Sequence, residues 1–254
     1  MTTTTTTTIT RAIPDIRSTD LARSRAFYVD LLGFDVCMEQ HGMVMFCSPS
    51  HSWVQITLNG DDPPLPSGFL VDVDTADDAA RLHDEAIARG LRIVEPLNDK
   101  PQDVREFSVL DPSGTRVTVL AHIGRTVRAD AEDTEHPVQI VRAIPTVRSR
   151  DLVETRDFYV EYLGFEECME RDHMLMFCSR SHPRVQVIAH DQLAHPPGFD
   201  LDVGDVDRVN ALHAQSVDLG YTVVSPPSDI DDAVRAFVVL DPNGTGVSVL
   251  AHLT

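Results

Sequence analysis

Ionisable side chains recur at matching positions in the two halves of this 254-residue sequence. Arg17 returns as Arg148 (148 − 17 = 131), and His122 returns as His252 (252 − 122 = 130). An arginine can hold a carboxylate through paired hydrogen bonds, and a histidine can act as a general base near neutral pH. The simpler alternative for each histidine is a solvated position at a strand end.

The arginines belong to predicted strands whose alternation also directs their neighbours. Asp15 and Arg17 share one face of their strand, and Thr146 and Arg148 match them in the second half. These side chains are candidates for the lining of a ligand site. Ordinary salt bridges compete with this interpretation, because such pairs are common on half-exposed sheets. The candidate partners are Glu39 and Glu170.

The four cysteines obey the same repeat and form no Cys-x-x-Cys motif. Because no secretory signal precedes them, we expect them to be reduced and buried. A three-residue loop centred on Gly42 would make Cys37 and Cys47 direct cross-strand partners. A two-residue His41-Gly42 turn, which the glycine favours, places Cys37 opposite Phe46 instead. The second register is the one we predict.

Two aromatic positions have open interpretations. His51 and its counterpart His182 end the repeated motif Phe-Cys-Ser-x-Ser-His, where turn chemistry and function explain them equally well. A displaced metal site built from His51, His122 and a cysteine stays an alternative. Trp53, the single tryptophan, matches Arg184, and it can stack on a planar ligand or cover a strand edge. This asymmetry indicates that the two halves offer different clefts.

The elements that position these residues follow one βαβββ pattern, which occurs twice in each half. A period this long predicts domain duplication rather than a solenoid. The expected fold is α+β, with four βαβββ modules paired into two tandem, cup-shaped, half-open eight-stranded barrels. In the first half we expect a strand over 12–17, a helix capped by Asp20 or Thr19 and ended by Gly33, strands over 34–40, 43–48, 53–58 and 68–74, a helix from Thr75 to Arg89, and strands over 91–95, 104–110 and 115–122.

Composition sets the domain boundaries and excludes some partners. We expect a disordered Thr-rich tail at 1–10, a first domain at 11–123, a charged linker at 124–138 and a second domain at 139–254. A net charge of −19 argues against nucleic acid and permits a cationic ligand, although acidic residues also serve solubility. No apolar run suits a membrane helix, and the start lacks a signal peptide, so we expect a cytoplasmic protein without a membrane partner.

Several motifs resemble the glyoxalase / bleomycin resistance / extradiol dioxygenase superfamily, the vicinal oxygen chelate fold. In the first half they are Asp20-Leu21, Phe27-Tyr28, Leu32-Gly33-Phe34 and Asp111-Pro112-Ser113-Gly114, and each has a counterpart in the second half. The resemblance covers nearly all of both domains. It implies the fold more firmly than any one chemistry, because related sites serve enzymes and plain binders.

The resemblance also implies where a divalent metal would be held. Metal-dependent members use His, Gln or Glu on three inward strands. Those positions hold residues that are apolar or bear only a hydroxyl: Ile13, Phe69 and Thr118 in the first half, and Ile144, Phe199 and Ser248 in the second. Neutral hydroxyls are poor ligands beside carboxylate or imidazole, so the sequence predicts a protein with no metal and no other cofactor.

The sequence therefore predicts a metal-free protein that sequesters a small molecule, such as a cationic aromatic compound or an antibiotic. The alternative is a glyoxalase-like lyase or isomerase, or a dioxygenase, with a displaced metal or histidine acid–base chemistry. A third possibility is a scaffold with closed clefts. The chain is expected to be a monomer with an internal pseudo-dimer, or a homodimer. The expected lining residues are Asp15, Arg17, Trp53, Phe69, Thr118, His122, Arg148, Phe199, Ser248 and His252.

Overall fold

The computed structural model describes residues 9–40, 42–60, 67–100, 103–124, 141–230 and 233–253. These residues form the predicted α+β fold: two eight-stranded mixed sheets, each with two edges rather than a closed ring. The first sheet has the order β2-β3-β4-β1-β5-β8-β7-β6, and the second repeats it as β10-β11-β12-β9-β13-β16-β15-β14. The predicted tail and linker lie almost wholly outside the described residues, and the domain boundaries stay a prediction.

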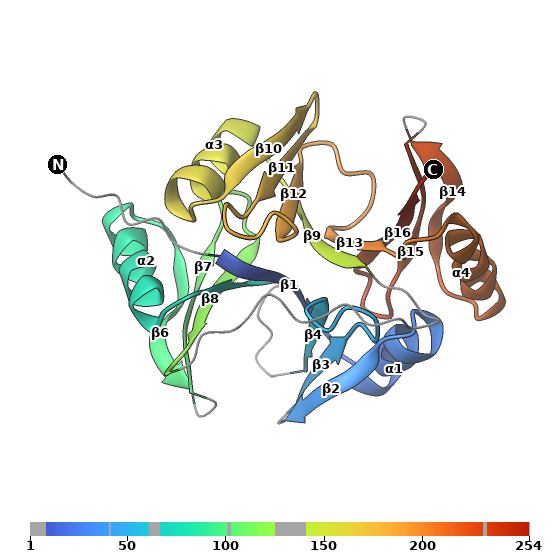
Figure 1. The fold of residues 1–254 in the computed structure, drawn as a ribbon, viewed down its shortest axis with the longest axis horizontal. Helices are drawn as coiled ribbons and strands as arrows, with labels where there is room; N and C mark the ends of the chain where they lie inside the picture. The colour runs from blue at the N-terminus through green and yellow to red at the C-terminus, as the bar shows by residue number, and fades with distance from the viewer. Residues whose placement is uncertain are drawn as a thin grey trace. The chain divides into compact units, whose positions relative to one another are not determined.

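Each sheet is built from two βαβββ modules, as the sequence repeat predicts (Figure 1). The first module has β1 (Ile9–Arg17), α1 (Leu21–Arg25), η1 (Ala26–Leu31), β2 (Asp35–Gln40), β3 (Met43–Cys47) and β4 (Gln55–Asn59). The second has β5 (Gly68–Val73), α2 (Ala76–Ala88), β6 (Ile93–Lys100), β7 (Val104–Leu110) and β8 (Arg116–His122).

The second half of the chain repeats both modules. The third module has β9 (Arg142–Arg148), α3 (Leu152–Arg156), η2 (Asp157–Tyr162), β10 (Glu166–Arg171), β11 (Met174–Cys178) and β12 (Gln186–His190). The fourth has β13 (Gly198–Asp202), α4 (Val206–Asp218), β14 (Val223–Ile230), β15 (Val234–Leu240) and β16 (Gly246–His252). Among the described helices, α2 and α4 are the longest at 13 residues each, and no described helix has the length and apolarity to span a membrane.

The short helices begin and end where the sequence predicts. Asp20 caps α1 by accepting a hydrogen bond from the Arg23 amide, which otherwise has no partner within the helix. The continuation η1 is a π-helix rather than an α-helix, since Leu32 N donates to Phe27 O at 3.2 Å. Gly33 then ends the helix with a φ of 85°, a conformation that glycine adopts without a steric penalty.

By contact, the chain divides into two compact units, and each unit draws on both halves of the sequence. One unit contains the second and third modules apart from most of β9, and the other contains the first and fourth modules apart from the start of β1. Strand β1 passes from one unit to the other after Ala12, and β9 does so after Thr146.

Each unit has its own hydrophobic core. In the first unit, Tyr159 of η2 stacks on Phe69 of β5, with ring centroids 6.2 Å apart. In the second unit, Tyr28 of η1 lies over Phe199 of β13 in the same way, at 6.4 Å. The motifs that carry the family resemblance therefore meet across the repeat: the Tyr28 hydroxyl donates to Asp241 of the opposite copy at 3.0 Å.

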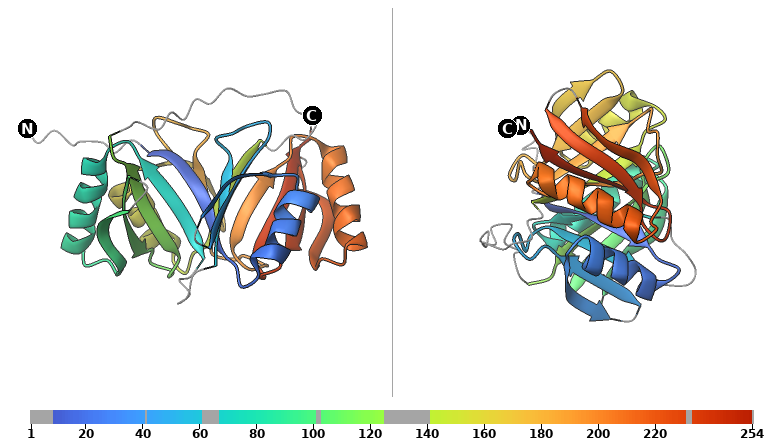
Figure 2. Two further views of the ribbon diagram at one scale, coloured as in Figure 1. Left: turned by 90° about the horizontal axis from the view of Figure 1, so that it is seen from below. Right: turned by 90° about the vertical axis from the view of Figure 1, so that its right-hand side faces the viewer.

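Each helix covers only one face of the strands against which it packs. In Figure 1, α2 lies against β6–β8 and α4 lies against β14–β16, and the two further views in Figure 2 show α4 running along one face of its strands. The cores lie on this covered side. We call the opposite side of each module's strands the inner face.

Candidate ligand-binding site

Strict alternation along the strands sets which side chains reach the inner face. In β13, Asp200 lies between Phe199 and Leu201, which both belong to the core. Ser248 of β16 lies between two core valines in the same way. Inner-face residues from the middle of β9, β13, β15 and β16 form what we call the second-copy face: Ile144, Thr146, Asp200, Val238, Ser248 and Leu250. Arg142 and Asp202 follow on the same side and pair with each other.

Asp200 is the acidic centre of the second-copy face. Its carboxylate accepts a hydrogen bond from Thr146 Oγ1 at 3.1 Å and another from the Ser248 side chain. Protein atoms surround the carboxyl group, although part of the residue's surface stays accessible to solvent. Burial raises the pKa of Asp200 to about 6, and the two hydroxyl donors oppose this rise only in part.

Apolar side chains flank this carboxylate. Asp200 lies directly across from Ile144 in β9 and from Ser248 in β16, and Ser248 lies across from Val238 in β15. Ile144 and Val238 are 7% and 8% exposed, so they are nearly buried yet still touch solvent. Within the described ranges, no Arg, Lys or His forms an ion pair with Asp200. An ionised carboxylate held only by neutral hydroxyls between apolar walls favours a cation of matching size.

Strands β5, β6, β7 and β8 of the first half carry a different set, the first-copy face: Leu70, Glu95, Ser108, Arg116 and Thr118. Here polar groups bond to one another in a chain. Arg116 Nη1 donates to Thr118 Oγ1 at 2.8 Å, Thr118 and Ser108 share a hydrogen bond of 2.8 Å, and Ser108 Oγ donates to Glu95 at 2.6 Å. The same network thus contains the guanidinium of Arg116 and the carboxylate of Glu95. Leu70 occupies the position that Asp200 has in the second copy.

Asp15 is an acid on the inner face of β1. It accepts hydrogen bonds from Thr57 Oγ1 at 2.9 Å and from the Asn59 side-chain amide, and it is 1% exposed. Its position on the same face as Arg17 agrees with the predicted alternation. As a residue, Asp15 is more deeply covered than Asp200.

Both predicted histidines lie at strand ends beside an arginine–aspartate pair. His252 lies 2.9 Å from Arg142 Nη2, which in turn pairs with Asp202 at 2.7 Å. In the first half, Arg11 pairs with Asp72. Burial raises the pKa of Asp72, while Arg11 and then His122 act in the opposite direction. The histidines are therefore held in charged clusters rather than merely solvated.

The structure corrects the predicted direction of Phe69 and Phe199. Both are 1% exposed and lie in the hydrophobic cores, on the side away from the inner face. The inner-face positions of these strands are one residue further on, at Leu70 and Asp200. The prediction followed the resemblance, which implies an inward residue directly after Gly68 and Gly198, whereas packing of the following residues against the core turns the inner face to the next position.

Other predicted residues have contacts that the sequence did not indicate. Trp53 packs against the core of its unit and edge-on to His51, at 6.1 Å between ring centroids. The acids proposed as partners of the repeated arginines are paired elsewhere, since Glu39 bonds Arg25 and Glu170 bonds Arg156. Arg148 is exposed at the end of β9.

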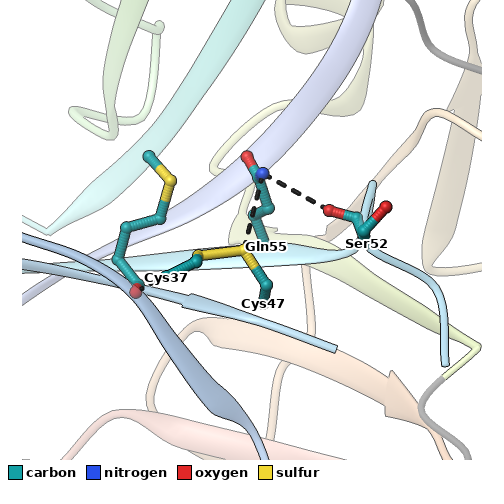
Figure 3. Close-up of a disulfide and its surroundings, with 5 residues drawn as sticks. Cys37, Cys47, Ser52 and Gln55 are labelled. Atoms are coloured by element: carbon teal, nitrogen blue, oxygen red, sulfur yellow. Dashed lines mark hydrogen bonds between the residues drawn. A yellow bond between two sulfur atoms is a disulfide. The ribbon is translucent and has the colours of Figure 1, made fainter. Parts of the chain in front are cut away.

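The prediction of reduced, buried cysteines is wrong in this structure. Disulfides join Cys37 to Cys47 and Cys168 to Cys178. Gln40 lies opposite Met43, which is the predicted register, but a β-bulge between Val36 and Met38 displaces Cys37 from its predicted place opposite Phe46. The bulge adds one residue to β2, which lets Cys37 reach Cys47 (Figure 3). His41 lies outside the described residues.

Sequence comparison now gives the family. The sequence model of the Glyoxalase/Bleomycin resistance protein/Dioxygenase superfamily matches residues 8–119 and 139–249. The chain belongs to this superfamily. The two matched segments coincide with the two sheets, so the family module occurs twice in tandem. A search of curated proteins finds no match for this superfamily member.

Solved structures with the same fold include enzymes of several kinds. A Mn(II)-bound glyoxalase from Novosphingobium aromaticivorans has a TM-score of 0.70 and 16% identity, covering 98% of this chain and 83% of its own. The 2,3-dioxygenase LapB from Pseudomonas sp. KL28 has a TM-score of 0.69 and 15% identity, and the match covers 98% of this chain and 95% of LapB. An extradiol ring-cleaving dioxygenase from B. fuscum has a TM-score of 0.72 and 18% identity, and the match covers 98% of this chain and 73% of the dioxygenase. At such identities the likeness establishes the fold alone.

The side chains of this superfamily member do not fit a divalent metal on the inner face. On the second-copy face, Asp200 is the single ionisable donor, and its neighbours Thr146 and Ser248 offer only hydroxyls. In the described part of the chain, no three His, Cys, Asp or Glu side chains gather as a metal site would require. We therefore derive no chemical step through a metal.

Sequence reasoning found part of this site and missed its centre. It placed Asp15, Thr118 and Ser248 on the inner face, but it overlooked Asp200 and Arg116. A usable signal was present: Val71 and Val73, like Leu201 and Val203, alternate as core residues ahead of a capped helix. Counting back from them directs Asp200 to the inner face.

Proposed function

We propose that this superfamily member is a metal-free binding protein that holds a small organic cation on the second-copy face. The observation that carries the proposal is Asp200, a partly exposed residue whose carboxylate has two hydroxyl donors and, among the described residues, no cationic partner. A bound cation supplies the counter-charge that the protein does not. Ile144, Val238 and Leu250 then suit the apolar body of the ligand, such as an aromatic ring.

Electrostatics across the whole chain support the same ligand class. The net charge of −19 raises the local concentration of cations and speeds their encounter with the protein. Since pKa 6 lies below physiological pH, Asp200 is largely ionised when free. Binding a cation stabilises the ionised form further, so ligand affinity should rise as the pH rises through 6.

Calorimetric titration with benzylamine and benzyl alcohol tests the proposal, because these probes differ mainly in charge at pH 7.5. The protein should bind benzylamine more tightly, and Asp200→Asn should weaken that binding by about 10- to 100-fold, the usual value of a hydrogen bond to a charged group. The control is Asp218→Asn, which removes one exposed charge at the end of α4. Equal binding of both probes, or equal loss in both variants, would contradict the proposed site.

A second candidate is an enzyme that uses acid–base chemistry on the same face. Asp200, with its raised pKa, suits proton transfer near neutral pH better than an ordinary carboxyl group does. Such a lyase or isomerase would work without the ligand set of its metal-dependent relatives. Metal analysis after purification without chelator separates this candidate from a displaced-metal enzyme: stoichiometric metal that resists dialysis would favour the latter.

A further inference from the structure

The two disulfides occupy equivalent hairpins, and in each one the two sulfur atoms have different surroundings. Cys37 and Cys168 are exposed, whereas Cys47 is half-buried and Cys178 is 9% exposed. The exposed members lie at β-bulges in β2 and β10, where the ladder is interrupted. An incoming thiol therefore reaches one sulfur of each bond more easily than the other.

Hydrogen-bond donors add a second difference in the same direction. Gln55 Nε2 lies 3.7 Å from Cys47 Sγ, and Gln186 Nε2 lies 3.6 Å from Cys178 Sγ. Figure 3 shows the Gln55 amide directed toward Cys47 and the Ser52 carbonyl. An N–H donor stabilises a thiolate and so makes that sulfur the better leaving group.

The exposed sulfurs face acceptors instead. Cys37 Sγ lies 3.4 Å from the Met45 carbonyl oxygen, and Cys168 Sγ lies 3.4 Å from that of Met176. A carbonyl oxygen repels a thiolate and accepts a hydrogen bond from a protonated thiol. In each disulfide, attack on the exposed sulfur is therefore favoured, and the less exposed sulfur, Cys47 or Cys178, leaves as the thiolate.

We propose that Cys37 and Cys168 are sites of reversible modification by small thiols, with Cys47 and Cys178 as the resolving cysteines. A small thiolate attacks Cys37 Sγ and forms a mixed disulfide, while the Cys37–Cys47 bond breaks and its electron pair leaves on Cys47. A second thiolate attacks the small-molecule sulfur, releases Cys37 as a thiolate and forms a small disulfide. Two small thiols are thus oxidised to one small disulfide, with the loss of two electrons in total, and the protein disulfide is reduced to two thiols.

The reverse reaction uses the same groups. A small disulfide transfers one half to the Cys37 thiolate, and the Cys47 thiolate then displaces it and restores the protein disulfide. This pairing of an accessible cysteine with an adjacent resolving cysteine is typical of reversible redox sites. The proposal concerns the β2–β3 and β10–β11 hairpins and is independent of ligand binding at Asp200.

Mass mapping of trapped intermediates tests the assignment. Protein purified without reductant is treated briefly with 2-mercaptoethanol, quenched with acid, alkylated and digested. We expect the mixed disulfide on Cys37 and Cys168 and the alkyl group on Cys47 and Cys178. The opposite assignment would overturn the proposal, as would alkylation of all four cysteines before any thiol is added.

The two hairpins serve as matched controls for each other. Gln55→Met keeps the side-chain volume but removes the donor, so opening of the Cys37–Cys47 bond should slow by about fivefold. The rate at Cys168–Cys178 should not change, and Gln186→Met should give the converse result. A fold defect would alter both hairpins; in that event Cys47→Ser and Cys37→Ser are compared. The thiol left in Cys47→Ser should react faster with 2-hydroxyethyl disulfide, and equal rates would contradict the proposal.

Discussion

The first-copy and second-copy faces share three equivalent pairs of strands, β5 with β13, β7 with β15 and β8 with β16, yet their charged groups are arranged differently. Their covered sides match, since Phe69 and Phe199 occupy the same place in the two cores. On the inner side, Arg116 is replaced by Gly246 and Ser108 by Val238, while Leu70 is replaced by Asp200. The first face bonds its own polar groups into a chain, and the second leaves one carboxylate among apolar side chains.

This difference shows which parts of a duplicated module are free to diverge. The covered side is constrained by close packing against a helix, where a change of one methylene is already costly. The inner side tolerates a change from a satisfied polar network to an apolar surface around one acid, provided that each buried polar group keeps a partner. Asp200 on the second-copy face therefore has no counterpart on the first-copy face, where Leu70 holds the equivalent position.

Truncating the shared core residues should give the largest effects and should act equally in both copies. Phe69→Ala and Phe199→Ala each remove a fully buried ring, and we expect each to lower the free energy of unfolding by about 3–5 kcal/mol. Urea unfolding monitored by circular dichroism measures this. If either substitution had a small effect on stability but abolished ligand binding, that phenylalanine would lie on the inner face and not in the core.

Removing the charge of Asp200 should show the difference between the two faces most clearly, through the pH dependence of stability. The folded-state pKa of about 6 exceeds the reference value of 3.8, so the folded protein binds this proton more tightly than the unfolded chain does. Asp200 therefore favours folding most below pH 4, and this contribution is lost as the pH rises through 6. The full difference is up to about 3 kcal/mol.

Asp200→Asn should consequently be more stable than the unmodified protein at pH 8, and the gap should close as the pH falls toward 4. Thermal or urea unfolding at a series of pH values measures this difference. Asp218→Asn again serves as the control, because it removes one exposed carboxylate at the end of α4. If Asp200→Asn is less stable at pH 8, the carboxylate has a cationic partner and the comparison between the faces fails.

Much of this architecture follows from the sequence because it depends on local signals. The offset of 131 predicted the tandem copies, and Asp20 and Gly33 predicted both ends of the first helix. The turn His41-Gly42 predicted the pairing of Gln40 with Met43. Each of these signals acts within a few residues, where backbone sterics and capping decide the outcome.

The rest depends on contacts that no short segment contains. The bulge that brings Cys37 to Cys47 is set by packing of the whole hairpin, and the bond between Tyr28 and Asp241 joins residues from opposite copies. The proposed role of Asp200 depends on the lack of an Arg, Lys or His partner among the described residues, and a sequence without spatial neighbours does not give that information. Sequence therefore predicted the strands better than the chemistry between them.

Removing the hydroxyl groups of the equivalent residues Thr118 and Ser248 should lower the free energy of unfolding by intermediate and unequal amounts. Thr118→Val breaks the chain between Arg116 and Ser108 at a site that is 2% exposed, so we expect a loss of about 2 kcal/mol. Ser248→Ala removes one of two donors to a partly accessible acid and should cost about 1 kcal/mol. Chemical unfolding at pH 7 measures both, and equal losses would mean that both faces contain coupled networks.

The smallest effect should come from neutralising Glu95 at the end of the first-copy chain. Glu95→Gln keeps an oxygen to accept from Ser108 but replaces a charged acceptor by a neutral one, which should cost about 0.5–1 kcal/mol. Its effect should also be additive with that of Asp200→Asn, because Glu95 and Asp200 share no hydrogen-bond partner. The double variant, unfolded in urea at pH 7, should therefore show the sum of the single effects. A departure from the sum of more than about 0.5 kcal/mol would show that the two faces are energetically coupled and do not act as separate sites.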